Sequence, residues 1–220
     1  MRWLDYKPTD NLTLQYYYGS LEDFYKQHFL GLKHDLKLGE GTLRTDLRHF
    51  DNHSDGANGH DSDYYTVGYY GNGVTKGKVD SRLSSAQFSY LIKGHMFAAG
   101  YQVVSGKSDA VWLNQGDGST AYFMTESMIG KFQRAGERTW QVRYGYDFAN
   151  VGIPGLTFVG MYESGSNIKA VDGDKQEWER NVTLAYTVQS GPAKDLNIQL
   201  RHAQLRSTVG NQRDADEHRI

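Results

Sequence analysis

Five arginines carry the clearest chemical signal in this sequence. Each lies in or beside a strand-like segment, and together they are Arg44, Arg48, Arg143, Arg201 and Arg219. A guanidinium stays charged and presents a planar fork of donors that matches a carboxylate. Removing a carboxylate from water is unfavourable unless fixed positive charge replaces the water. Spaced arginines on one surface therefore suit the passage of a carboxylate from one site to the next, each binding it weakly enough to release it.

A structural role is the alternative for some of these arginines. For Arg44, Arg48 and Arg143 we expect salt bridges with acidic residues of the same surface, and the candidates are Asp46, Glu179 and Asp147. All five remain candidates for binding an anionic solute.

The histidines and acidic residues form no recognisable catalytic motif. Neither G-x-S-x-G nor H-E-x-x-H occurs. Glu22 and Asp23 are sequence neighbours, which in a strand point to opposite faces and so cannot form a catalytic pair. Residues 51–56 have oxygen ligands at close spacing but lack the distal glutamate of a calcium loop, so we expect a solvated loop there. We expect no catalytic residue, metal or cofactor, and surface positions for His28, His34, His49, His53 and His60.

Composition narrows the remaining classes of function. The 220 residues suffice for one sizeable domain, and 25 glycines, 16 tyrosines and only 3 prolines favour strands and turns. The absence of cysteine excludes disulfides and thiol chemistry, and a net charge of −2 with dispersed basic residues gives no reason to expect nucleic acid. No apolar run is long enough for a transmembrane helix.

The segment at 137–148 indicates how the arginines are positioned. One parity carries an apolar and aromatic series, whereas the other is polar and charged, with Glu137, Thr139, Gln141 and Arg143. Side chains alternate faces along a strand, so one face of the sheet is apolar and the other polar. A soluble sandwich buries the apolar face, and a membrane barrel turns it outward to lipid.

Strand length and loop sorting favour the barrel. Nine strands are predicted, at 11–18, 25–38, 42–50, 82–92, 95–105, 137–149, 155–165, 176–189 and 194–206, with parts of two more at 1–6 and 217–220. Most approach the roughly 9–11 residues that cross a bilayer at a tilt. Tight turns alternate with long polar connections at 51–81, 106–136, 166–175 and 207–216, as expected of a barrel with extracellular loops. The short connection at 19–23 is the exception.

Several motifs, taken in order, resemble the C-terminal half of the OprD-like outer membrane porins. They include Tyr16-Tyr17-Tyr18, Leu43-Arg44-Thr45-Asp46-Leu47-Arg48, Gly100-Tyr101-Gln102, Glu137-Arg138-Thr139-Trp140-Gln141, Gly152-Ile153-Pro154-Gly155, Trp178-Glu179-Arg180, Val188-Gln189-Ser190-Gly191-Pro192 and Glu217-His218-Arg219-Ile220. Each motif alone is weak, but their order and spacing are specific. The resemblance covers nearly the whole chain.

The resemblance implies an antiparallel transmembrane β-barrel of eighteen strands, monomeric and with a narrow lumen. It implies passive uptake of small carboxylate-bearing solutes, such as amino acids, past a ladder of arginines. Arg201 and Arg219 match ladder positions, so the resemblance favours a solute-binding role for these two. Gln199 stands where the family often has arginine, which leaves the substrate branch open. The implied surroundings are the Gram-negative cell outer membrane, with its lipid and lipopolysaccharide.

The chain is expected to be part of one barrel domain, at 1–220, with no separate second domain. About nine full strands do not close a barrel, and no signal peptide is recognisable at the start, so we expect a fragment of a porin. Two alternatives remain, an outer-membrane barrel hydrolase and a soluble β-sandwich binding module.

Overall fold

The chain forms one antiparallel sheet in which every strand pairs with its neighbours in sequence. A computed structural model describes residues 2–59, 78–111, 123–170, 172–210 and 214–220. The strands within these ranges are β1 (Arg2–Thr9), β2 (Leu12–Leu21), β3 (Tyr25–Leu38), β4 (Gly41–Ser54), β5 (Asp80–Ile92), β6 (His95–Gly106), β7 (Arg138–Asp147), β8 (Leu156–Ile168), β9 (Lys175–Thr187), β10 (Asn197–Ser207) and β11 (Ala215–Arg219). Their order in the sheet is β1 to β11.

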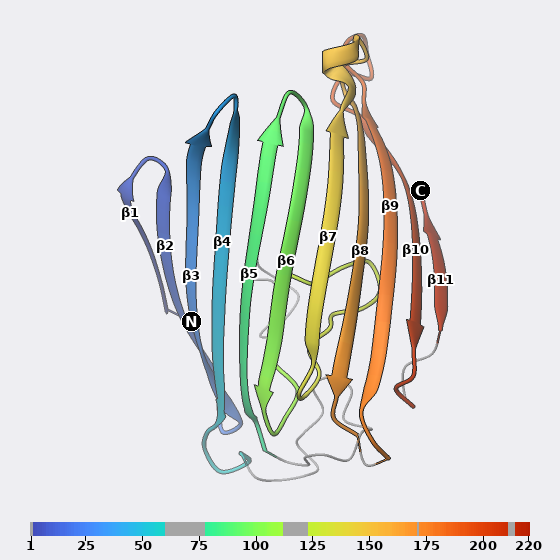
Figure 1. Ribbon diagram of the computed structural model, residues 1–220. Helices are drawn as coiled ribbons and strands as arrows, with labels where there is room; N and C mark the ends of the chain where they lie inside the picture. The colour runs from blue at the N-terminus through green and yellow to red at the C-terminus, as the bar shows by residue number, and fades with distance from the viewer. Residues whose placement is uncertain (1, 60–77, 112–122, 171, 211–213) are drawn as a thin grey trace.

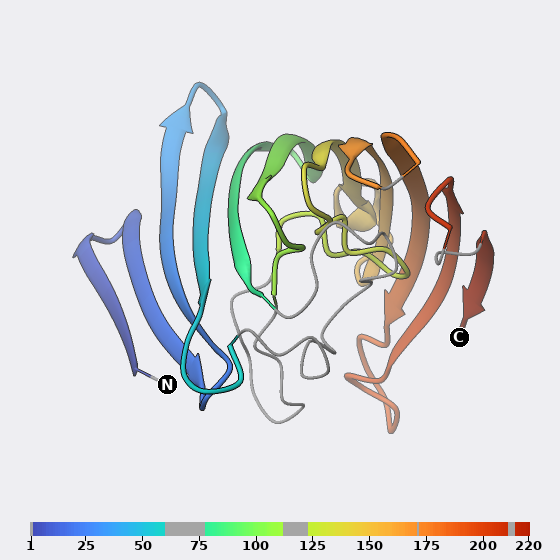
Figure 2. The ribbon, with the colours of Figure 1, turned by 90° about the horizontal axis from the view of Figure 1, so that it is seen from below.

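The sheet is strongly curved, and its connections are sorted by end. Figure 1 shows the tight turns at one end of the strands and the longer connections at the other. Viewed along the strands, the sheet forms an arc with a concave inner side (Figure 2). All nine predicted strands are confirmed, and the two partial ones are β1 and β11. The short exception between β2 and β3 is confirmed as well.

The two faces of the sheet are inverted relative to a soluble protein. On β7, Thr139 and Gln141 are 0% and 1% exposed, whereas Trp140 and Val142 are each 45% exposed. Ile198 and Leu200 are likewise about half exposed, on the face of β10 opposite Arg201. Because a soluble sandwich would bury these apolar side chains, the β-sandwich alternative is wrong.

The turn after β7 is more elaborate than the tight turn expected at 150–154. A short 3₁₀ helix, η1 (Phe148–Val151), begins there, and the Asp147 side chain caps it by accepting from the Ala149 N–H at 2.9 Å. Gly152 ends it in the left-handed region at φ 90°, a conformation that glycine adopts without steric penalty. Within the described ranges, no helix has the length and apolar character needed to cross a bilayer.

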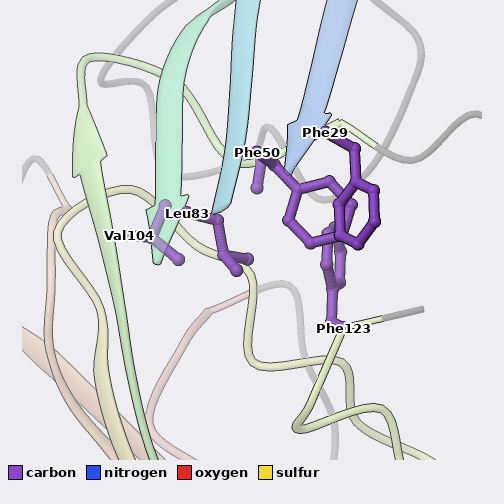
Figure 3. Close-up of a cluster of buried hydrophobic side chains, with 6 residues drawn as sticks. Phe29, Phe50, Leu83, Val104 and Phe123 are labelled. Atoms are coloured by element: carbon purple, nitrogen blue, oxygen red, sulfur yellow. The ribbon is translucent and has the colours of Figure 1, made fainter. Parts of the chain in front are cut away.

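The inner face is polar in the middle of the sheet but apolar at the end with the long connections. Figure 3 shows a cluster there, in which Phe29, Phe50, Leu83 and Val104 come from four adjacent strands and pack with Phe123 from the connection after β6. The Phe29 and Phe50 rings are 4.7 Å apart, and Phe123 meets Phe50 edge-on at 5.2 Å. The cluster therefore attaches that connection to the wall.

The segment at 51–56 differs from the solvated loop expected from its composition. Residues 51–54 continue β4, so their side chains alternate between faces. Asn52 is buried, where it accepts from Gln27 at 2.7 Å and donates to Ser81 at 3.1 Å. This pairing with β3 and β5 explains why the polar residues extend a strand.

Candidate functional site

The described second part of the connection between β6 and β7 lies on the concave side of the sheet. This part, residues 123–137, is called the lumen segment below, and it lies inside the arc in Figure 2. The sequence predicted only a long polar loop at 106–136. Hydrophobic residues such as Phe123 and Phe132, both nearly inaccessible to solvent, were the available signal that this loop is not solvated.

Side chains from four strands hold the lumen segment through its backbone. From β6, Gln102 donates to the Phe132 carbonyl and to Thr125 Oγ1, each at 2.8 Å. Arg143 on β7 donates to the Met124 carbonyl at 3.1 Å, and Arg219 on β11 donates to the Met128 carbonyl at 3.2 Å. Glu179 on β9 accepts from three backbone N–H groups of the segment. Bonds from four strands fix the segment against the wall.

A recess of about 260 Å³ lies between the lumen segment and the inner face of β7 to β11. Its charged lining consists of Arg143, Arg201, Arg219 and Glu126. Three arginines of the predicted ladder thus line one recess, although they come from three different strands. The recess can surround a small anionic group with positive charge.

Arg201 and Arg219 are direct cross-strand neighbours in the ladder between β10 and β11. Directly opposed side chains in an antiparallel pair lie about 5 Å apart at Cβ, and like charges there repel. Arg219 is partly neutralised by Glu217, at 2.6 Å from its Nε. Within the described part of the chain, Arg201 has no hydrogen-bond or ion-pair partner and is exposed to the recess. The pair is a site of unbalanced positive charge.

Arg48 and Arg44 lie on the same inner face but are engaged by acidic residues. Arg48 forms a two-point ion pair with Asp46 of its own strand, at 2.7 and 2.8 Å. It lines a second recess of about 350 Å³ that also includes Arg143 and Glu126. Arg44 lies nearer the tight-turn end and pairs with Asp35 through two bonds of 2.7 Å.

The expected salt-bridge partners were only partly correct. Asp46 does pair with Arg48, but the partner of Arg44 is Asp35 on β3. Arg143 donates to the Gln141 side chain and to a carbonyl rather than to a carboxylate. Asp147 caps η1, and Glu179 binds the lumen segment. The register of the strands determines the partner of Arg44, because Arg44 lies directly opposite Asp35 in the ladder between β3 and β4.

Glu126 is a candidate site residue that the sequence did not indicate. It is the acidic group of both recesses, and its Oε2 is buried without a hydrogen-bond partner among the described residues. Burial raises the pKa of its carboxyl, and the nearby Lys131 ammonium opposes that change. An acidic group facing several arginines gives the recess charges of both signs.

None of the described histidines lines the two recesses. His28 and His49 face outward, where they contact Tyr16 Oη and Ser84 Oγ, each at 2.9 Å. His34 contacts Asn11, and His53 contacts Asp51. His60 lies outside the described residues. Among the residues that the structure describes, no cluster of metal-ligating side chains occurs.

Comparison with known proteins gives one consistent result. The chain matches the description "outer membrane porin, OprD family" over residues 3–220. It is 32% identical to the porin-like protein GalP of Pseudomonas putida, covering 93% of this chain and 44% of that protein. It is 30% identical to Porin D of Pseudomonas aeruginosa, covering 98% of this chain and 50% of that protein.

The crystal structure of OccK8 (OprE) of Pseudomonas aeruginosa is similar to this fold. It has a TM-score of 0.87 and 56% sequence identity, and the match covers 97% of this chain and 54% of that chain. The chain therefore spans about half the length of the relatives that it matches.

Proposed function

The chain belongs to the OprD family of outer membrane porins, a family of channels and not of enzymes, and on that premise we propose that it forms part of the wall of a substrate-selective channel. The proposed function is passive uptake of small carboxylate-bearing solutes, such as amino acids, across the Gram-negative outer membrane. The proposed solute-binding residues are Arg143, Arg201 and Arg219, with Arg48 and Arg44 continuing the ladder along the inner face.

The opposed pair of Arg201 and Arg219 is the observation that carries this proposal. Like charges at directly opposed positions destabilise a sheet, so a purely structural role explains their placement poorly. An anionic group in the recess compensates both charges, and a guanidinium suits a carboxylate in particular. Because the recess is open to water, each interaction stays weak enough for the solute to move on.

Glu126 supports the narrower proposal of solutes that carry both charges. Its carboxylate lines the same recess as the three arginines, and one of its oxygens has no partner among the described residues. A solute ammonium at Glu126 and a solute carboxylate at Arg201 and Arg219 match this arrangement. An amino acid carries these two groups.

The proposed oligomeric state and membrane surroundings follow from the family and from the residues on the outer face of the sheet. We propose a single barrel domain that includes residues 1–220, in a barrel of eighteen strands that is monomeric in its full-length form. The exposed Arg180 lies beside Trp178 at the end with the long connections, where a guanidinium can reach headgroups. Lipopolysaccharide of the outer leaflet is the proposed lipid partner there.

The test compares matched solutes in the full-length porin reconstituted in bilayers. Arg201→Ala and Arg219→Ala should lower the flux of a carboxylate solute by about fivefold or more, a factor that corresponds to roughly 1 kcal/mol for one charged contact in a water-filled recess. Flux of the uncharged amide of the same solute should change little. Arg82→Ala is the control, because Arg82 is exposed on the outer face.

Equal losses for the carboxylate and for its amide would refute the ladder role of these arginines. Equal losses in the Arg82→Ala control would instead identify a general effect on the barrel. Glu126→Gln extends the test, because it should reduce flux of a zwitterionic amino acid more than flux of the corresponding simple carboxylate.

A further inference from the structure

We propose that Glu179 is the positioning residue of the channel: its carboxylate fixes the lumen segment beside Arg201 and Arg219 and so sets the width and the ion preference of the passage. This inference rests on the proposed channel function. It assigns to Glu179 a role distinct from that of the arginines, because Glu179 does not line the recess.

The carboxylate of Glu179 is completely buried and bound by backbone N–H groups. Its side chain is 0% exposed on the inner face of β9. One oxygen accepts from Met128 N–H at 3.2 Å and from Ile129 N–H at 3.1 Å, and the other accepts from Gly130 N–H at 2.5 Å. Three successive N–H groups that converge on one carboxylate form an anion-binding nest. The contact is therefore built for a charged group.

The turn that Glu179 holds is the part of the lumen segment that forms the recess. Ser127 closes this turn, since its N–H and its hydroxyl both donate to the Gly130 carbonyl at 3.2 Å. Glu126, Ser127 and Met128 line the recess immediately before the bound amides. Any movement of the turn away from Glu179 consequently moves the wall that faces the arginines.

The same turn is also held from β11, but less strongly. Arg219 donates to the Met128 carbonyl at 3.2 Å, and Glu179 accepts from the Ile129 N–H of the same peptide unit, so that unit is held at both ends. This links the two sites physically: Glu179 determines where the Met128 carbonyl lies, and that carbonyl occupies part of the hydrogen-bonding capacity of Arg219. Releasing the turn frees Arg219 for anions and widens the passage at the same time.

Gly130 provides a second way to break the contact, from the side of the segment. A Cβ at Gly130 would lie 3.0 Å from Glu179 Oε2 and 2.8 Å from a ring carbon of Phe132, which is buried. Gly130 is not among the residues with positive φ, so alanine at this position adds crowding without backbone strain. Gly130→Ala should therefore separate the turn from β9 while leaving every charge in place.

The experiment measures single-channel currents in potassium chloride, with no carboxylate solute present. Glu179→Gln replaces one acceptor oxygen with an amino group that opposes the backbone N–H groups. Loss of a charge-assisted bond should raise the detached fraction of the segment about tenfold or more. We expect larger open-channel noise, a higher mean conductance and a shift of the reversal potential toward chloride, and Gly130→Ala should produce the same three changes.

Two variants control for charge and for added volume. Glu22→Gln removes an exposed carboxylate in the connection between β2 and β3. Gly160→Ala adds a methyl group that would make only ordinary contact, at 3.4 Å from Phe158. Both should leave noise, conductance and reversal potential unchanged. Heat-modifiable gel mobility of all four variants reports whether the barrel has folded.

The outcomes separate this inference from the function on which it rests. Wild-type currents in both Glu179→Gln and Gly130→Ala, in folded barrels, would overturn the positioning role. A change in Glu179→Gln alone would also overturn it, because the effect would then come from the lost charge and not from segment position. A wild-type channel without preference for carboxylates would refute only the proposed substrate class, since the readout here is potassium chloride current.

Discussion

Protonation of Asp109 should control how firmly the lumen segment is attached. Asp109 lies in the connection after β6 and is 4% exposed, and its Oδ1 accepts from Ala135 N–H at 2.7 Å. Burial raises the pKa of this carboxyl from 3.8 to about 6; the Glu177 carboxylate raises it further, while the Ala135 N–H and the Arg134 guanidinium oppose the change. When the segment is attached, the neutral acid therefore predominates below about pH 6, whereas in water it would predominate only below 3.8.

The size and sign of the effect follow from that pKa. When the segment detaches, Asp109 returns to water and to its ordinary pKa of 3.8. The difference of about two units corresponds to roughly 3 kcal/mol. A raised carboxyl pKa means that the attached state binds more protons, so its stability is greatest below about pH 4 and declines as the pH rises to about 6.

Hydrogen exchange at the amide of Ala135 measures this attachment directly. Between pH 4 and 7, protection of that amide, corrected for intrinsic exchange, should fall by up to about 100-fold in the wild type. Asp109→Asn keeps an acceptor oxygen but cannot ionise, so protection of the Ala135 amide should decline distinctly less with pH in this variant. A control is Asp172→Asn, whose side chain is exposed in the connection between β8 and β9. An identical decline in wild type and Asp109→Asn would refute the reasoning.

Two further predictions concern the stability of the wall. Val142→Arg places a charge on the lipid-facing side near the middle of β7. It should lower the free energy of unfolding in vesicles by about 2–4 kcal/mol, measured by urea titration. Thr183→Arg places the same charge on the inner face and should lower the free energy of unfolding much less. Phe50→Ala removes a buried ring of the cluster at the end with the long connections and should cost about 3–5 kcal/mol in the same titration; a loss below 1 kcal/mol would show that the cluster does not stabilise the wall.

The strands and their faces were predictable because they depend on local alternation. The parity at 137–148 placed Trp140 outward and Gln141 inward, and both placements are confirmed by their exposure. The strand that contains Arg48 was predicted to end at residue 50. It continues to Ser54, because Asn52 has hydrogen-bond partners on both neighbouring strands. Partners across a sheet cannot be read from composition.

The candidate site was predictable only in its wall. Inward parity indicated Arg143 and Arg201, the family resemblance indicated Arg201 and Arg219, and the structure brings all three to one recess. Glu126 and the contact of Glu179 with the lumen segment depend on how a long connection folds back between strands. That contact joins residues about fifty positions apart through backbone amides. Every sequence has backbone amides, so no residue type indicates the contact.

The way the wall is paired has an evolutionary consequence. Within the described ranges, each strand from β1 to β11 pairs with its neighbours in sequence, so duplication or deletion of a hairpin leaves the remaining pairs intact. The lumen segment breaks this modularity, because it is bound from β6, β7, β9 and β11 at once. A hairpin gained or lost among those strands would move Glu179 or Arg219 out of reach. Phe123 of the same segment also packs on β3 to β5. Variation in hairpin number among descendants of this sequence should therefore be concentrated in β1 and β2 and rare from β3 onward.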